Sequence, residues 1–241
     1  MLTDPTEAIS SAPLAPHPRL WVFNPGHEEA LRIPLPLRYT PTSEVRQMRH
    51  DLAPLLTLLA KRGDYIYRPA LAPHQPAVLL DHEGHEVSVE DLRGASLEVK
   101  LWGLEPHILR ELVEAPLLGG LRLQLPPITP TYLQMAHRRA AHGLLSRLVE
   151  RGGYPRELQP LWVEAGATRG ETRRALQQAL DSQSHRVHGS REEVLVKRPF
   201  SSSGRGVLPF PRLYTERHLE ALTGSCQRLG MISIEPLWPV R

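Results

Sequence analysis

Proline is the residue that most limits how this chain can fold. The sequence has 24 prolines among 241 residues, roughly twice the typical share. Proline fixes φ and lacks a backbone N–H, so it ends helices and is excluded from central strands. We therefore expect short elements with sharp ends. The 41% of hydrophobic and 23% of charged residues are typical of a globular chain and exclude wholesale disorder.

Charge and cysteine content narrow the class of protein. The formal net charge is only +3, and the basic residues are spread along the chain, whereas nucleic-acid binders gather them on one face. This spread argues against nucleic-acid binding. A nucleic-acid-binding module is kept as an alternative only because the chain is rich in arginine. The single cysteine, Cys226, cannot form an internal disulfide and fits a reducing compartment.

The sequence carries neither an apolar run of 18 residues nor the pattern of a secretory signal at its start, and these are the features of membrane and exported chains. We expect a cytoplasmic protein that does not enter a membrane, with residues 1–19 as a flexible tail.

Short apolar runs alternate with helical patterns, which predicts an α/β fold. The expected strands cover 20–23, 64–68, 77–80, 86–89, 97–102, 193–197 and 231–235. The expected helices cover 42–62 with a break at Pro54, 105–114, 130–151, 168–181 and 215–229. The proline-rich stretch 123–130 is the expected boundary between a parallel-sheet domain over 20–125 and a second domain over 126–241.

The segment with the most specific chemistry is VLVKRPFSSSGRGVLPF, residues 194–210. A strand leads to Lys197, a loop with three serines and two glycines follows, and a second apolar run ends the segment. Glycines allow close approach to a phosphate, while backbone N–H groups, serine hydroxyls and a lysine can surround its oxygens. The lysine precedes the glycines, unlike in a P-loop, so the pattern predicts a hairpin flap over a nucleotide. An ordinary hairpin loop with a solvated lysine is the alternative.

Several segments together resemble the ATP-grasp proteins, in particular an uncharacterised bacterial group with that fold. VKRPFSSSGRGV resembles the glycine-rich flap, and IEPL (234–237) resembles the hinge that lies against adenine. WVFNPGHEEAL (21–31), LEVKLWGLEPHILREL and AHRRAA resemble the group's FNPxxxxAL, PWGWNPxLRxxL and SHRKxA segments. The resemblance implies the parallel-sheet domain that precedes ATP-grasp modules, followed by the flap-bearing part of an ATP-grasp domain. The implied activity is ATP-dependent ligation, in which a carboxylate is activated as an acyl phosphate and attacked by an amine, thiol or similar nucleophile. The acceptor substrate is not indicated.

The resemblance also assigns roles to individual residues. Lys197 would contact the α- and β-phosphates of ATP. Arg139 stands where the group often has lysine and would be a second phosphate contact. Glu235 and the backbone through Leu237 would meet the adenine edge. The phosphate flap would consist of Ser201, Ser202, Ser203, Gly204, Arg205 and Gly206.

Magnesium is the metal that the resemblance implies, but its ligands are not expected in this chain. ATP-grasp proteins place Asp, Glu and Asn ligands well after the hinge, and the sequence ends at Arg241. We therefore expect a piece of a longer enzyme. Because phosphoryl transfer needs a metal to neutralise the developing charge, we expect this piece to bind nucleotide weakly and not to turn it over. A non-catalytic nucleotide-binding or interaction protein is the alternative.

Two further groups of polar residues are candidates for binding. Asn24, His27 and Glu28 follow the first strand, where ligands gather in α/β sheets, and a solvated turn is the alternative. His82 and His85, with the acids beside them, could bind a metal, although a solvated hairpin turn is the preferred interpretation.

The remaining histidines and tryptophans of note are assigned to packing. His137 and His142 are expected to be surface or packing residues. The four tryptophans are expected in the core, at positions Trp21, Trp102, Trp162 and Trp238.

Overall fold

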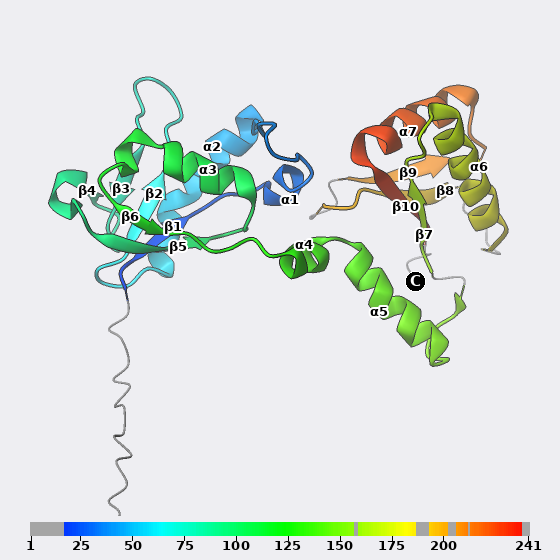
Figure 1. Ribbon diagram of the computed structural model, residues 1–241, viewed down its shortest axis with the longest axis horizontal. Helices are drawn as coiled ribbons and strands as arrows, with labels where there is room; N and C mark the ends of the chain where they lie inside the picture. Colours follow the sequence, from blue (N-terminus) through cyan, green and yellow to red (C-terminus); the bar gives the residue numbers. More distant parts are fainter. Residues whose placement is uncertain (1–16, 157–158, 187–192, 202–205, 212, 238–241) are drawn as a thin grey trace, which may run out of the picture. The chain divides into compact units, whose positions relative to one another are not determined.

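The computed structural model describes residues 17–156, 159–186, 193–201, 206–211 and 213–237 (Figure 1). They divide into two compact units, one comprising Met1–His27 and Arg38–Pro127, the other Glu28–Leu37 and Ile128–Arg241. The segment Glu28–Leu37 thus groups with the second unit, although its sequence position suggested the first. Local patterns carry no information on which unit a loop packs against. None of the helices in the described ranges combines the length and apolar character needed to cross a bilayer.

The N-terminal unit is built on a six-stranded sheet with the order β4-β3-β2-β1-β5-β6. Its strands are β1 Arg19–Val22, β2 Tyr65–Arg68, β3 Val78–Leu80, β4 Glu86–Val87, β5 Ser96–Leu101 and β6 Arg122–Gln124. β1, β2, β5 and β6 run parallel, and β3 and β4 form an antiparallel hairpin at one edge. The predicted α/β class and this hairpin are confirmed. β6 is an additional strand that lies partly in the proline-rich stretch.

Helices cover both faces of this sheet. They are α2 Ser43–Leu52, η1 Ala53–Leu58, η2 Val89–Leu92, α3 Pro106–Glu114 and η3 Pro116–Leu118, where η marks a 3-10 helix. The short helix α1 His27–Ala30 falls at the division between the two units. Because side chains alternate along a strand, Leu20 and Val22 share a core with α3, while Trp21 packs with η1 on the other face. The change from α2 to η1 occurs beside Pro54, as predicted.

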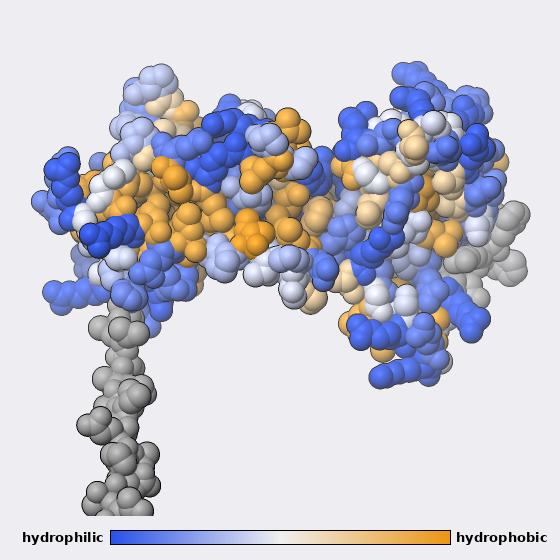
Figure 2. All heavy atoms as spheres, in the orientation of Figure 1, coloured by the Kyte–Doolittle hydropathy of each residue, from blue (hydrophilic) through white to orange (hydrophobic). Residues whose placement is uncertain are grey.

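Apolar side chains also reach the surface of the N-terminal unit, where they gather on the face turned to the viewer in Figure 2. Trp102 is one exposed apolar residue and contradicts the expected core position. It is 60% exposed and packs edge-on against Phe23, with ring centroids 5.4 Å apart. The reason is its place in the chain, because it follows the last residue of β5, where the strand leaves the sheet.

The C-terminal unit is built on a four-stranded antiparallel sheet with the order β7-β10-β8-β9. Its strands are β7 Leu161–Glu164, β8 Glu193–Lys197, β9 Val207–Pro211 and β10 Met231–Pro236, and its helices are α4 Pro130–Ala136, α5 Arg139–Glu150, α6 Arg169–Arg186 and α7 Glu216–Leu229. The capping box predicted for α6 is confirmed, since Thr168 and Glu171 each accept a hydrogen bond from the other's backbone N–H at 3.2 Å. β7 was not predicted.

The single helix expected over 130–151 is instead two helices. His137, at the end of α4, has an extended backbone with ψ of 134°. The N–H of Arg138 then donates to the carbonyl of Pro199 at 2.9 Å. A tertiary hydrogen bond therefore replaces a helical one at the break, which local sequence does not reveal.

Alternation along β8 and β10 gives this sheet one apolar and one polar face. Val194, Val196, Ile232 and Ile234 are buried in the core formed with α6 and α7, the two helices drawn beside the sheet in Figure 1. Because successive side chains of a strand point to opposite faces of the sheet, the residues between these four lie on the other face. That face carries the residues of the predicted nucleotide site.

Candidate functional site

Strand register brings the polar residues of three strands together. Lys197 at the end of β8 pairs directly with Ser233 of β10, and Ser233 pairs on its other side with Trp162 of β7. Residues directly opposite each other in neighbouring strands project from the same face. Lys197, Ser233 and Trp162 therefore share one face, and Glu235, two residues after Ser233, joins them.

An ion pair forms the centre of this face. The Nζ of Lys197 donates to Oε2 of Glu235. The other carboxylate oxygen accepts from the Ser233 hydroxyl at 3.0 Å and lies 3.2 Å from Nε2 of His142 on α5. The side chains of Lys197, Glu235 and His142 are only 18%, 14% and 13% exposed. We call these four residues the Lys197–Glu235 cluster.

The cluster fixes the charge of its carboxylate. Burial alone raises the pKa of Glu235, but the hydrogen bonds from His142 and Lys197 outweigh that effect and lower the pKa to about 2. Glu235 is therefore a carboxylate at neutral pH, held between the Lys197 ammonium and the donors of His142 and Ser233.

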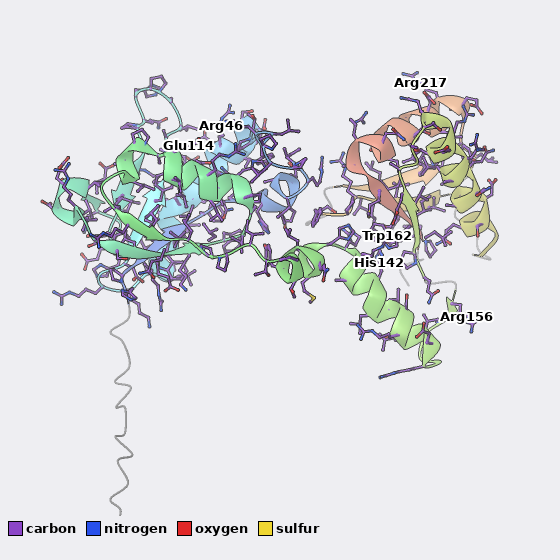
Figure 3. The ribbon with its side chains drawn as sticks, in the orientation of Figure 1. Arg46, Glu114, His142, Arg156, Trp162 and Arg217 are labelled. Carbon is purple, nitrogen blue, oxygen red and sulfur yellow. The ribbon has the colours of Figure 1, made fainter. Side chains whose placement is uncertain are left out.

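An aromatic and histidine layer from α5 and β7 lies beside the cluster. His142 and Trp162 are labelled in Figure 3, and their ring centroids are 5.3 Å apart. The Nδ1 of His142 and the indole N–H of Trp162 are buried, and neither has a hydrogen-bond partner within the described ranges. Buried polar atoms normally have partners, so these two atoms mark a place where a polar ligand would be stabilised.

The predicted flap begins beside the cluster. Lys197 pairs with Val207 across the β8–β9 hairpin, so the intervening loop starts and ends at this end of the sheet. Gly206 has φ of +77°, and a Cβ there would lie 2.8 Å from Cδ of Arg198, so glycine is required both by backbone conformation and by space. Ser202, Ser203, Gly204 and Arg205 lie outside the described residues.

Two arginines at the start of α5 hold the loop and the sheet. Arg138 donates from Nη2 to the hydroxyl of Ser201 at 2.7 Å and to its carbonyl at 3.2 Å. Arg139, the expected second phosphate contact, donates to Glu164 at 2.9 Å, and its guanidinium lies 5.3 Å from the centre of the Trp162 ring. Arg139 thus belongs to the same face, but it is already paired with a carboxylate.

A cavity of about 640 Å³ borders this region. It is lined by α4 and α5, by Phe200 at the start of the loop and by Met231 of β10. Leu237, expected to meet the adenine edge, is half-buried and follows β10 directly.

The residues that follow β1 and were predicted to bind substrate have structural contacts. Asn24 is fully buried, and its side chain donates to the carbonyl of Gly103 at 2.6 Å and accepts from its N–H at 3.0 Å. These bonds tie together the segments that follow β1 and β5. His27 packs so closely on Gly103 that a Cβ there would lie 2.0 Å from the imidazole Cγ. Glu28 is half-buried in the first turn of α1.

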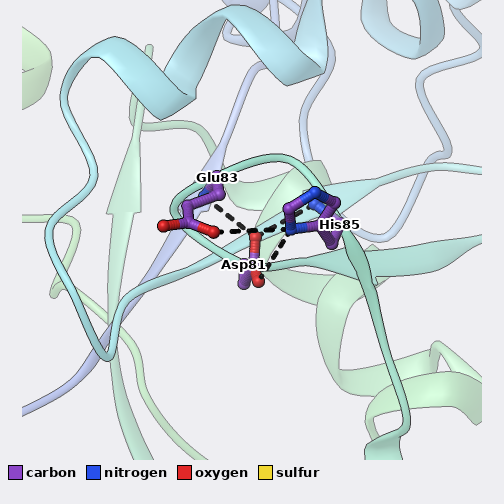
Figure 4. Close-up of side chains that lie close together, drawn as sticks. All are labelled: Asp81, Glu83 and His85. Carbon is purple, nitrogen blue, oxygen red and sulfur yellow. Dashed lines mark hydrogen bonds and ion pairs between the residues drawn. The ribbon is translucent and has the colours of Figure 1, made fainter.

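The hairpin between β3 and β4 brings together Asp81, Glu83 and His85, whose candidate ligand atoms lie within 4.8 Å of one another (Figure 4). Asp81 Oδ1 accepts from the backbone N–H of Glu83 at 2.8 Å and of His85 at 3.0 Å. These bonds lower the pKa of Asp81, and they are the hydrogen bonds of an Asx turn. The turn explains the cluster without a metal.

Comparison with known proteins adds no family to this geometry. A scan against models of known protein families finds no match, and a search of curated proteins finds no significant one.

Sequence reasoning missed four residues of the site. Trp162 was expected in the core, but strand register places it on the polar face, where it is half-buried. Ser233 could have been placed beside Glu235 from the alternation in MISIEP. His142 and Arg138 reach the site from α5, far away in sequence, and no local pattern signals those contacts.

Proposed function

We propose that the C-terminal unit binds ATP on the polar face of its antiparallel sheet, with the β8–β9 loop closing over the phosphates. The observation that carries the proposal is the Lys197–Glu235 cluster, which stands where the serine- and glycine-rich loop begins. The Lys197 ammonium, the buried indole N–H of Trp162 and a loop suited to binding phosphate thus occur at one end of the same sheet.

Each part of the cluster has a role in nucleotide binding. A lysine ammonium has three donors, so Lys197 can contact phosphate oxygens while it keeps its bond to Glu235. The ionised Glu235 carboxylate can accept a hydrogen bond from the exocyclic amino group of adenine. Trp162 offers an aromatic surface and a buried indole N–H without a described partner, suited to a base or ribose.

Magnesium does not fit the residues of the cluster. Mg²⁺ takes carboxylate and water oxygens in near-octahedral geometry. The one carboxylate in the cluster, Glu235, already accepts from Lys197, His142 and Ser233. The Lys197–Glu235 cluster therefore supports nucleotide binding and leaves Glu235 poorly placed to bind Mg²⁺.

ATP-dependent ligation of a carboxylate to an amine or thiol is the reaction class that the resemblance to ATP-grasp proteins implies. The Lys197–Glu235 cluster bears only on the nucleotide-binding part of that reaction. Nucleotide binding without turnover is the second candidate function. It is favoured because the Glu235 carboxylate is already bound by Lys197, His142 and Ser233. If the protein binds ATP but does not consume it in the presence of Mg²⁺, binding without turnover is the function.

Binding of ATP to the wild type, to Lys197→Ala and to the control Lys61→Ala tests the proposal. Lys61 is an exposed lysine of the N-terminal unit. ATP at about 100 times its Kd should stabilise the protein by ~2.7 kcal/mol, which is a rise in Tm of roughly 5–10 °C for a chain of this size. We expect the rise in the wild type and in Lys61→Ala and its loss in Lys197→Ala. An equal rise in all three proteins would remove Lys197 from the site, and the lack of a rise in the wild type would refute the proposal.

A further inference from the structure

The N-terminal unit contains a cavity of about 850 Å³ beside its parallel strands. Tyr67 of β2, the segment that follows β2, the residues that lead into α2, and both α2 and α3 supply its walls. The volume is within the range of small-molecule sites. In the sheet order, β2 and β5 flank β1, so the chain leaves β1 on one side and returns on the other. Ligands of α/β sheets bind outside the carboxyl ends of strands at such a switch point.

Charged side chains of both signs line this cavity. Its arginines are Arg38, Arg49 and Arg110, and its glutamates are Glu105, Glu111 and Glu114, the last labelled in Figure 3. Glu105 accepts from the backbone N–H groups of His107 and Ile108 at 2.6 and 2.8 Å, so the N-terminus of α3 balances its charge. Besides Glu105, the lining thus carries three guanidinium groups and two carboxylates.

Arg49 is the least exposed of these cations. Its side chain is 5% exposed, and Nη1 donates to Glu111 at 3.3 Å. Its Nε is buried and has no hydrogen-bond partner in the part of the chain that the structure describes. A guanidinium has five donors, and leaving a buried charged donor unpaired is costly. An oxyanion of a ligand would supply the acceptor that this arginine needs.

The two remaining carboxylates of the cavity differ in how well they are paired, and Glu111 has the weaker pairing. Glu111 and Glu114 are 40% and 47% exposed. Arg38 donates to Glu114 through two bonds of 3.0 and 3.2 Å, whereas Glu111 has the one bond from Arg49. Burial raises the pKa of Glu111, and the charge and hydrogen bond of Arg49 offset part of that effect. A ligand ammonium beside Glu111 would complete the compensation.

Tyr67 adds a neutral polar group to the wall. Burial, with a smaller effect from Glu111, raises the pKa of its hydroxyl to about 12, so the hydroxyl keeps its proton and can donate a hydrogen bond.

We propose that this cavity binds a small zwitterion of amino-acid or short-peptide size, whose carboxylate meets Arg49 and Arg110 and whose ammonium meets Glu111. A polyphosphate is a poor match, since its several negative charges would meet three guanidinium groups that are already largely offset by Glu111 and Glu114. The inference does not depend on ATP binding, because every residue that carries it belongs to the N-terminal unit.

The test uses the full chain and a mixture of the twenty α-amino acids and the dipeptides built from them, screened by ligand-observed NMR. The best-binding compound is then compared with its N-acetyl form, which lacks the ammonium, and with its C-terminal amide, which lacks the carboxylate. We expect each blocked form to bind about tenfold more weakly or worse, because each loses a charge-assisted contact. Inorganic phosphate and ATP should not compete for the cavity.

Variants assign the binding to this cavity. Arg110→Gln and Arg49→Gln should each weaken binding by about tenfold or more, and Arg62→Gln, an exposed arginine of the same unit, should leave it unchanged. Arg110 is only half-buried, so its variant tests the proposal even if Arg49→Gln fails to fold.

The proposal is overturned if no compound binds at 10 mM, the highest concentration to be tested, if a blocked form binds as tightly as the zwitterion, or if Arg110→Gln binds as well as the wild type. The ATP-induced rise in Tm should persist in Arg110→Gln, so failure of one proposal is distinguishable from failure of the other.

Discussion

Replacing Glu235 with glutamine should destabilise the C-terminal unit in a pH-dependent way. The pKa of this carboxyl is lowered from 4.5 to about 2, and each pKa unit corresponds to ~1.4 kcal/mol. The charged carboxylate therefore stabilises the folded unit by about 3 kcal/mol at pH 7 as an upper value. Glutamine keeps the shape but not the charge, and it leaves Lys197 buried without its counter-ion.

The sign of the pH effect follows from the lowered pKa. A group whose folded-state pKa is depressed stabilises fully above its unfolded pKa, here near 4.5, and the stabilisation is lost as the pH falls toward 2. The difference between the wild type and Glu235→Gln should thus shrink from about 3 kcal/mol at pH 7 to about 1 kcal/mol at pH 3.

Hydrogen-exchange mass spectrometry across a urea series measures this difference when it is read on peptides from β8 and β10. Glu150→Gln is the matched control, because Glu150 is an exposed acid of the same unit on α5. If Glu235→Gln shifts the unfolding midpoint no more than Glu150→Gln, or if its effect is the same at pH 3 and pH 7, the assignment of Glu235 as a buried, paired carboxylate is wrong.

Further predictions concern the thiol and two glycines. Cys226 is fully buried, and burial raises the pKa of its thiol to about 11. A thiol reagent at pH 8 should therefore label Cys226 only after unfolding. Rapid labelling of the native chain would contradict its position in the core. Gly103→Ala should destabilise the N-terminal unit by at least ~1 kcal/mol, since the added Cβ would clash with an imidazole at 2.0 Å. Gly143→Ala should instead stabilise α5 by up to ~1 kcal/mol, because nothing lies within 4 Å of its Cβ position. Urea midpoints of the two glycine variants, compared with the wild type, test both expectations.

The alternation of apolar residues made the fold class and most strands predictable. EVLVK and MISIE are strands in the structure, and Val194, Val196, Ile232 and Ile234 point from them into one core. β7 was missed because LWVE is short and follows prolines, and it becomes a strand by pairing with β10. Pairing with β10 therefore determined that this segment is a strand, which its intrinsic β-propensity alone left open.

The site was predictable to the extent that its residues lie in one segment. Lys197 and the loop that follows it were found from chemistry within a single stretch of sequence. The pairing of Lys197 with Glu235, and the hydrogen bond from His142, depend on strand register and on where α5 lies. For the same reason the sequence did not reveal that the amide of Asn24 joins two loops in the fold, and its role as a substrate ligand stays a prediction.

The most direct test of nucleotide binding on the polar sheet face is hydrogen–deuterium exchange of the full chain with and without ATP. The account predicts slower exchange over 195–211 and 231–237, and no change over 65–117 in the N-terminal unit. Unchanged exchange over both C-terminal segments at saturating ATP, or protection confined to the N-terminal unit, would contradict it.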